Sequence, residues 1–156
     1  MPWTYEYPRP ALTVDCVVFT GDGDTLQLLL IQRAHDPFAG CWALPGGFVD
    51  MDETAEDAAH RELKEETGIS GVQLKQFGSF SAVDRDPRER VVSIAYVGLL
   101  DIEQFQAHGG DDAAAAAWHP VNDLPPLAFD HRKIVDLAVQ RFRRDRFNST
   151  GIEMNS

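Results

Sequence analysis

Apolar residues gather in short runs along the chain, and two of these runs lie close together near its beginning. Residues 11–19 (ALTVDCVVF) and 26–33 (LQLLLIQR) are rich in branched apolar side chains, and GDGDT between them has turn chemistry. The two runs therefore predict a β-hairpin. Because the second run is almost continuously apolar, we expect it to be a central strand with both faces covered, so that helices pack on each side of the sheet.

Helical patterns occur in two places. From about Thr54 the stretch AEDAAHRELKEET consists largely of strong helix formers, and Gly68 is placed to end the helix. Towards the end of the chain, apolar residues recur at helical spacing from Asp130 to about Phe147. The pattern therefore predicts one helix in the middle of the chain and one near its end.

Further strands are expected between these helices. Residues 72–83 and 90–100 read as strands on either side of the charged turn DRDPRER. The run of five alanines at 113–117 favours a short helix, although glycines before it and Pro120 after it bracket it closely. The whole pattern predicts a single α/β unit in which helices flank a sheet.

Length and composition limit the class of protein. A chain of 156 residues that is 44% hydrophobic and 25% charged fits one soluble domain, which we place at 1–147 with 148–156 as a flexible tail. No apolar run approaches the ~18 residues of a membrane span, and MPWTYEYPRP lacks the basic and apolar parts of a signal peptide. We therefore expect a cytoplasmic protein with no membrane partner, in which Cys16 and Cys41 are reduced packing residues.

The formal net charge of −11 limits the partners. A nucleic acid duplex is normally bound by a basic surface, so we expect no duplex partner. An acidic enzyme acting on an anionic substrate would need bound cations to offset the repulsion. The aromatic N-terminal arm WTYEYPRP has no obvious internal partner, so that a homodimer and packing on its own domain are both open.

Three carboxylates share one face of the predicted middle helix. At 100° per residue, Glu62, Glu65 and Glu66 fall within roughly 100° of the helix circumference. Such an acidic segment is ordinarily a solvated face. Here small alanines on the same helix allow close approach to a sheet, and Gly46 and Gly47 lie just upstream. Clustered carboxylates with a glycine carbonyl are the oxygen ligands that Mg²⁺ or Mn²⁺ takes.

The stretch GGFVDMDETAEDAAHRELKEETGI resembles the Nudix box over residues 47–69 at every specified position. These positions are Gly47, Glu53, Arg61, Glu62, Leu63, Glu65, Glu66, Gly68 and Ile69. The resemblance implies the Nudix fold, a mixed β-sheet sandwiched between α-helices. It also implies a Mg²⁺-dependent hydrolase (Mn²⁺ being the alternative ion) that cuts diphosphate linkages between a nucleoside and another group.

Roles for individual residues follow from the same resemblance. Glu62, Glu65, Glu66 and the backbone carbonyl of Gly46 correspond to the metal ligands. Arg61 and Glu53 correspond to an internal ion pair that holds the helix and its preceding loop. The base that accepts the proton of the attacking water is left open, and the candidate catalytic carboxylates are Glu66, Glu65 and Asp112. Asp111 and Asp112 also fit a solvated acidic turn.

Outside the box, the chain is similar to the ADP-ribose pyrophosphatase branch of the Nudix family. The implied reaction is ADP-ribose plus water giving AMP and ribose 5-phosphate. Arg33, Arg85 and Arg88 are candidates for binding phosphates, and Phe38, Phe80 or Phe129 for stacking an adenine, although plain surface and core roles compete. His119 and His131 are candidates for binding substrate or metal, although a lone histidine is more often structural. The alternatives are a pyrophosphatase for NADH, a dinucleoside polyphosphate, an oxidised nucleotide or an RNA cap, and a non-catalytic nucleotide-sensing Nudix domain.

Overall fold

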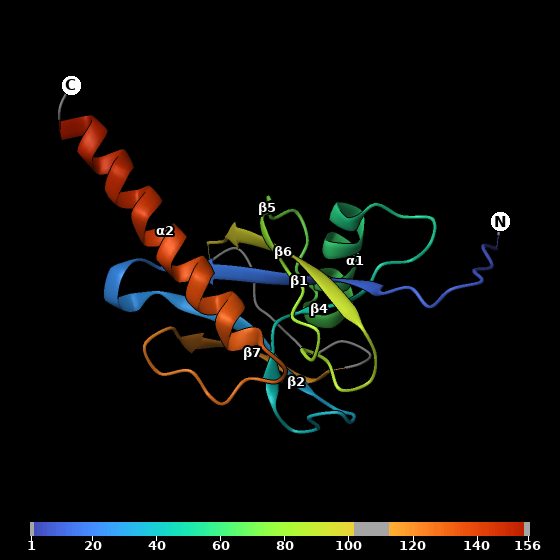
Figure 1. Cartoon of the computed structure of the whole chain (residues 1–156). Coiled ribbons are helices and arrows are strands. Elements are labelled where there is room, and N and C mark those ends of the chain that lie inside the picture. The colour runs from blue at the N-terminus through green and yellow to red at the C-terminus, as the bar shows by residue number, and fades with distance from the viewer. Residues whose placement is uncertain (1, 102–112, 155–156) are drawn as a thin grey trace.

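The structure is a computed structural model and describes residues 2–101 and 113–154. Within these residues one mixed sheet lies between two α-helices, α1 on one face and α2 on the other (Figure 1). The helices are α1 (Ala55–Thr67) and α2 (His131–Met154), with a short 3-10 turn η1 at Gly23–Thr25. The strands are β1 (Ala11–Thr20), β2 (Gln27–Arg33), β3 (Trp42–Ala43), β4 (Gly46–Phe48), β5 (Lys75–Phe80), β6 (Val91–Leu99) and β7 (Ala113–Pro120).

Strand β1 is the centre of the sheet, in the order β3-β2-β1-β6-β5. It runs parallel to β6, from the pair Ala11–Val91 to the pair Phe19–Leu99. The predicted hairpin is present but short, because β1 pairs with β2 only at its last two residues. The earlier part of β1 pairs instead with β4, where Asp15 lies opposite Gly46. This divergence of β1 from β2 brings the glycines of β4 beside the middle of the sheet.

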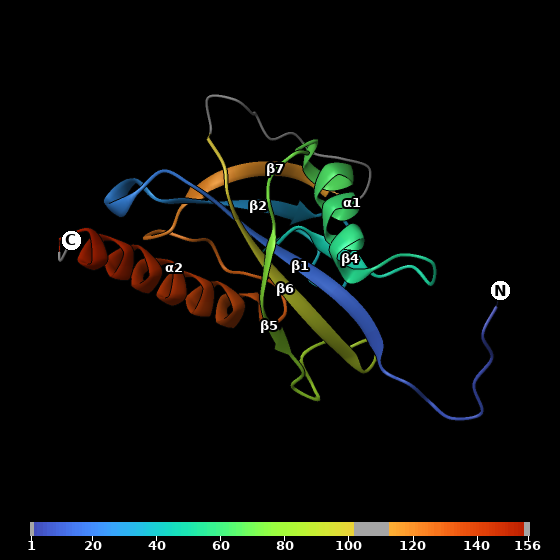
Figure 2. The ribbon, with the colours of Figure 1, turned by 90° about the horizontal axis from the view of Figure 1, so that it is seen from above.

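Side chains of the central strands alternate between two core layers. Cys16 of β1 and Leu29 of β2 pack in the layer under α1, whereas Val17 and Leu28 pack in the layer under α2. Figure 2 shows the strands between the two helices. The alternation explains why β2 is apolar at successive positions, as the sequence predicts for a strand covered on both sides.

Helix α1 is fixed at both ends by local capping. The Thr54 Oγ1 accepts a hydrogen bond from the Asp57 backbone N–H at 3.0 Å, and Gly68 ends the helix in the left-handed region at φ 77°. Ala58, Ala59 and Leu63 are completely buried against the sheet. The helix is therefore held closely over β1, as its alanines predict.

The alanine run, whose composition alone favours a short helix, is a strand. It forms β7, which is antiparallel to β2 from the Leu28–His119 pair to the Gln32–Ala115 pair. Alanine favours a helix locally, but the backbone groups of β2 on this side would otherwise lack partners, and sheet pairing decides the conformation. Helix α2 begins at His131 as expected, but it continues to Met154 instead of ending near Phe147.

The helices, the two cysteines and the N-terminal segment bear on three further predictions. None of the described helices has the length and apolar character of a membrane span. Cys16 is buried and Cys41 half-buried, and both are free thiols. The N-terminal segment extends away from the sheet in Figure 2, with Trp3 and Tyr7 exposed. The homodimer stays a prediction.

Candidate active site

A cavity of about 430 Å³ opens beside β4, at the side of the sheet that holds the Nudix-like box. Its lining comes from β1, β2, β4, α1, the segment between β5 and β6, and the beginning of α2. Side chains of both charges line the cavity. The acidic residues are Asp15, Asp36, Asp50, Glu62, Glu66 and Asp86, and the arginines are Arg33, Arg85 and Arg88.

The glycines of β4 allow the carboxylates of α1 to approach this strand closely. A Cβ at Gly47 would lie 2.6 Å from the Glu62 carboxylate, so only glycine leaves that group in place. At the neighbouring position, the Gly46 backbone N–H donates to Glu66 Oε1 at 3.2 Å. The backbone of β4 and the carboxylates of α1 therefore form one compact set of polar groups.

Glu62 and Glu66 are close enough to share a hydrogen bond. Burial raises the pKa of Glu62, and burial together with the hydrogen bond to Glu62 raises the pKa of Glu66 to about 9. The Gly46 N–H acts in the opposite direction on Glu66. Two carboxylates this close repel each other, and a cation bound against them would lessen that repulsion.

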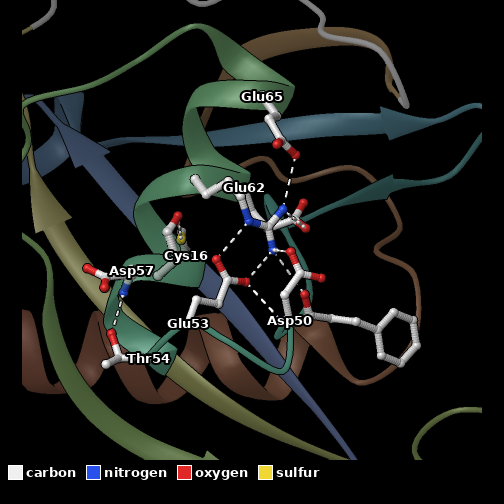
Figure 3. Close-up of polar contacts among 10 residues, drawn as sticks. Cys16, Asp50, Glu53, Thr54, Asp57, Glu62 and Glu65 are labelled. Atoms are coloured by element: carbon white, nitrogen blue, oxygen red, sulfur yellow. Dashed lines mark hydrogen bonds and ion pairs between the residues drawn. The ribbon is translucent and has the colours of Figure 1, made fainter. Parts of the chain in front are cut away.

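Arg61 joins the box into one unit, and Figure 3 labels the acidic residues that it contacts, Asp50, Glu53, Glu62 and Glu65. Its Nε and Nη2 donate to the two oxygens of Glu53 at 2.9 and 2.6 Å, and Nη2 also donates to the Phe48 carbonyl at 3.1 Å. The bond from Arg61, and next the bond from the Asp50 N–H, lower the pKa of Glu53 to about 2. The ion pair implied by the sequence resemblance is thus present.

The same guanidinium also bonds the acidic face of α1. Nη1 of Arg61 donates to Glu62 at 2.9 Å and to Glu65 at 3.1 Å. Glu65 is half exposed and does not line the cavity, unlike Glu62 and Glu66. Among the described residues, no three acidic, histidine or cysteine side chains meet as a ready metal-ligand set. The structure therefore brings together Gly46, Glu62 and Glu66 and leaves Glu65 beside them.

The three predicted substrate contacts, Arg33, Arg85 and Phe129, all line the cavity. Arg85 is almost completely buried and makes a two-bond pair with Asp130, with Nε at 3.0 Å and Nη2 at 2.7 Å from the carboxylate oxygens. Arg33 lies at the end of β2 with its Cζ 4.9 Å from the centre of the Phe129 ring. Phe129 has a left-handed backbone with φ 54°, which for a residue with a Cβ costs about 1–2 kcal/mol.

Sequence reasoning named His131 as a candidate but missed Asp15 and Ser93, which form a polar cluster with it at the cavity. Asp15 accepts a hydrogen bond from Ser93 Oγ at 2.5 Å and lies 3.3 Å from the Nε2 of His131. All three side chains are buried. A signal existed, because Asp15 is the one acid in ALTVDCVVF, a strand that is otherwise nearly all apolar. Its position puts it on the same face of β1 as Val17, towards α2.

Other candidates lie elsewhere. Asp111 and Asp112 are outside the described residues, so the prediction of Asp112 as a catalytic carboxylate stays a prediction. Phe80 packs on Phe77 in the α2 layer, and His119 packs against Trp42 with ring centres 4.5 Å apart. Neither of these two rings lines the cavity.

A family model described as the NUDIX domain matches residues 9–138. The chain belongs to the Nudix family. An ADP-ribose pyrophosphatase of Methanocaldococcus jannaschii is 45% identical over 129 residues, which are 83% of this chain and 73% of that protein. The ADPR responsive transcriptional repressor NtrR of Acinetobacter baylyi is 36% identical over 96% of this chain, which spans 61% of the repressor and so less than two thirds of it.

The solved structures agree with the Nudix fold. The NUDIX domain of Shewanella oneidensis NrtR, complexed with ADP ribose, superposes with a TM-score of 0.79 at 34% identity. The match covers 87% of this chain and 90% of that domain. The mixed sheet between helices expected from the sequence is therefore confirmed.

Proposed function

We propose that this Nudix protein is a divalent-metal-dependent pyrophosphatase that hydrolyses ADP-ribose to AMP and ribose 5-phosphate. The observation that carries the proposal is one cavity whose lining combines the box carboxylates Glu62 and Glu66 with three arginines. A diphosphate ester of a nucleoside suits such a site, because carboxylates can hold a divalent cation and guanidinium groups can bind phosphate oxygens. The likeness to an ADP-ribose pyrophosphatase and to a domain complexed with ADP ribose supports this choice of substrate.

The residues present fit a divalent cation. Glu62 and Glu66 offer oxygen ligands whose charges need a counter-ion, and Gly47 has no Cβ to displace Glu62. Glu62, Glu65, Glu66 and the Gly46 carbonyl would hold Mg²⁺, or Mn²⁺ in its place. When bound, the ion would supply an activated water and neutralise charge on the phosphoryl oxygens.

The chain's own residues would divide the remaining work. Arg61 and Glu53 hold the loop before α1 against the helix, which keeps Glu62 in position. Arg33 and Arg85 would contact the phosphates, and Phe129 would contact the base or a ribose. Glu66, Glu65 and Asp112 are the proposed catalytic carboxylates, of which Glu66 has its carboxyl group in the cavity.

The test is a substrate panel with the purified chain and MgCl₂. AMP release from ADP-ribose, abolished by a chelator and restored by Mg²⁺, is the expected result. NADH, dinucleoside polyphosphates, oxidised nucleotides and NAD-capped RNA serve as competing substrates. Faster cleavage of any of them than of ADP-ribose would replace the proposed substrate while keeping the proposed chemistry.

A second function is a nucleotide sensor without turnover. The observation that favours it is the 36% identity to NtrR, which is named for its response to ADPR. A sensor binds ADP-ribose tightly and releases no AMP, and its affinity for ADP-ribose changes little when Glu66 is replaced by Gln. The enzyme keeps binding in that variant but loses turnover.

A further inference from the structure

Two arginines from distant parts of the chain meet at one aromatic ring in the cavity wall. Arg33 Cζ lies 4.9 Å and Arg88 Cζ 5.6 Å from the centre of the Phe129 ring. Burial, and next the positive charge of Arg88, lower the pKa of Arg33. Two like charges are thus held close together at a cavity wall, an arrangement that an anion between them would stabilise.

Arg88 is held firmly although its side chain is 40% exposed. Its Nε and Nη2 donate to the two oxygens of Asp86 at 3.1 and 2.8 Å, and its backbone N–H donates to the same carboxylate at 2.9 Å. The Asp86 side chain is only 4% exposed. A buried carboxylate therefore fixes an exposed guanidinium, which limits the side-chain ordering that ligand binding requires.

Both guanidinium groups keep donors that the protein does not use. The Nε of Arg33 donates to the Pro37 carbonyl at 2.7 Å, and within residues 2–101 and 113–154 no acceptor meets either of its Nη atoms. Within the same residues, Nη1 of Arg88 also meets no acceptor, since its bonds to Asp86 use Nε and Nη2. Since both side chains line the cavity, these donors are available to a ligand there.

A second ring links this pair to the residues of the box. Arg88 Cζ lies 5.4 Å from the centre of the Phe48 ring, and Phe48 directly follows Gly47, where a Cβ would meet the Glu62 carboxylate. Arg33, Arg88, Glu62 and Glu66 all line the same cavity. An anion bound by the two guanidinium groups would therefore lie in the cavity that holds the box carboxylates.

We propose that Arg33 and Arg88 form a clamp for the diphosphate group of the substrate, with Asp86 as the positioning residue for Arg88. The identity of the substrate in this proposal rests on the proposed function, whereas the binding of a diphosphate group by the two arginines does not. Guanidinium groups match phosphate oxygens in shape and charge, and a pair of them on a rigid support binds two phosphates better than one. Substrates with a single phosphate therefore gain less from the clamp.

The clamp is tested by calorimetric titration of the full chain with inorganic pyrophosphate and with ADP, in the presence of Mg²⁺. Arg88→Ala is expected to weaken binding of both probes about tenfold or more, because each loses charged hydrogen bonds. Asp86→Asn is expected to weaken both probes less, and Arg88→Lys to restore part of the affinity. Arg90→Ala is the matched control, since Arg90 bonds the carbonyls of Ala82 and Val91 and does not line the cavity.

The two probes separate the clamp from its alternatives. Loss of ADP affinity with unchanged pyrophosphate affinity would mean that Arg88 supports base stacking on the rings, and would overturn the clamp. Unchanged affinity for both, or no binding of either probe by the wild-type chain, would overturn it as well. Binding of both probes through Arg88 without hydrolysis of ADP-ribose would remove the proposed function and leave the clamp standing.

Discussion

His131 Nε2 lies 3.3 Å from Asp15 Oδ1, and Nδ1 of the same ring accepts the Leu44 backbone N–H at 3.0 Å. With Nδ1 acting as an acceptor, the proton of the neutral imidazole is on Nε2, where it faces the carboxylate. One ring therefore connects β1, the segment before β4, and the first residue of α2. Asp15 and Gly46 are opposite each other in the sheet and both line the cavity. The connection through His131 therefore helps to hold this part of the cavity lining in place.

Loss of the Asp15 charge is expected to destabilise the fold. Asp15→Asn removes the negative charge that faces His131 and Arg85 and replaces one acceptor oxygen by an NH2 donor, so that a buried donor loses its acceptor, at a cost of about 1–3 kcal/mol. The free energy of unfolding in urea measures this cost. Asp136→Asn is the control, because Asp136 pairs with Arg132 on the exposed side of α2 and should cost less than about 1 kcal/mol. Equal effects of the two changes would contradict the role of Asp15.

The same carboxyl group gives a pH dependence of stability. Burial raises the pKa of Asp15, but the interaction with His131, the hydrogen bond from Ser93 and the charge of Arg85 outweigh burial and lower it. A group whose pKa is lower in the folded state stabilises the fold above its unfolded pKa, about 3.9 for Asp, and this contribution is lost as pH falls through the folded value. The stability difference between wild type and Asp15→Asn should therefore shrink below about pH 4. A difference that is constant down to pH 2 would refute this assignment.

Arg61 is expected to act through the metal-binding carboxylates. Arg61→Lys keeps one charge but cannot bond Glu53, Glu62 and Phe48 together, so the Mg²⁺ concentration for half-maximal activity should rise roughly 10–100-fold. Binding of Mn²⁺, followed by titration, should weaken in parallel. Lys64→Ala, on an exposed position of the same helix, should change neither quantity. An unchanged metal requirement in Arg61→Lys would show that Arg61 only stabilises the loop.

Gly47 should tolerate no side chain. A methyl group there would lie 2.6 Å from the Glu62 carboxylate, so Gly47→Ala must displace the end of that side chain while the backbone keeps its conformation. Activity should fall by at least about tenfold with little change in melting temperature. Gly78→Ala is the control, because its methyl group would meet Phe80 at an ordinary 3.8 Å. Full activity in Gly47→Ala would show that activity does not depend on the position of the Glu62 carboxylate.

The sequence predicted the local parts of this molecule better than the contacts between distant parts. Helix α1 and its glycine end follow from local propensities within one short stretch, and the Arg61–Glu53 pair was implied by the resemblance of that stretch to the Nudix box. The bond between Asp15 and Ser93 depends instead on the parallel register of β1 and β6. Nothing in either strand alone specifies that register.

Two further cases show the same limit. The alanine run became β7 because an edge of β2 was available for pairing, a fact that local helix propensity does not contain. Arg33 at the end of β2 and Arg88 in the turn before β6 both lie near the ring of Phe129, just before α2. The arginines were visible as candidates in the sequence, whereas their convergence on one ring was not.

The central claim is most directly tested by AMP release from ADP-ribose with Mg²⁺, compared between the wild-type chain and Glu66→Gln. The account predicts Mg²⁺-dependent release by the wild type and a loss of at least about 100-fold in kcat for the variant, with ADP-ribose still bound and the melting temperature retained. Absence of AMP release from the wild type, or equal release by the variant, would contradict it.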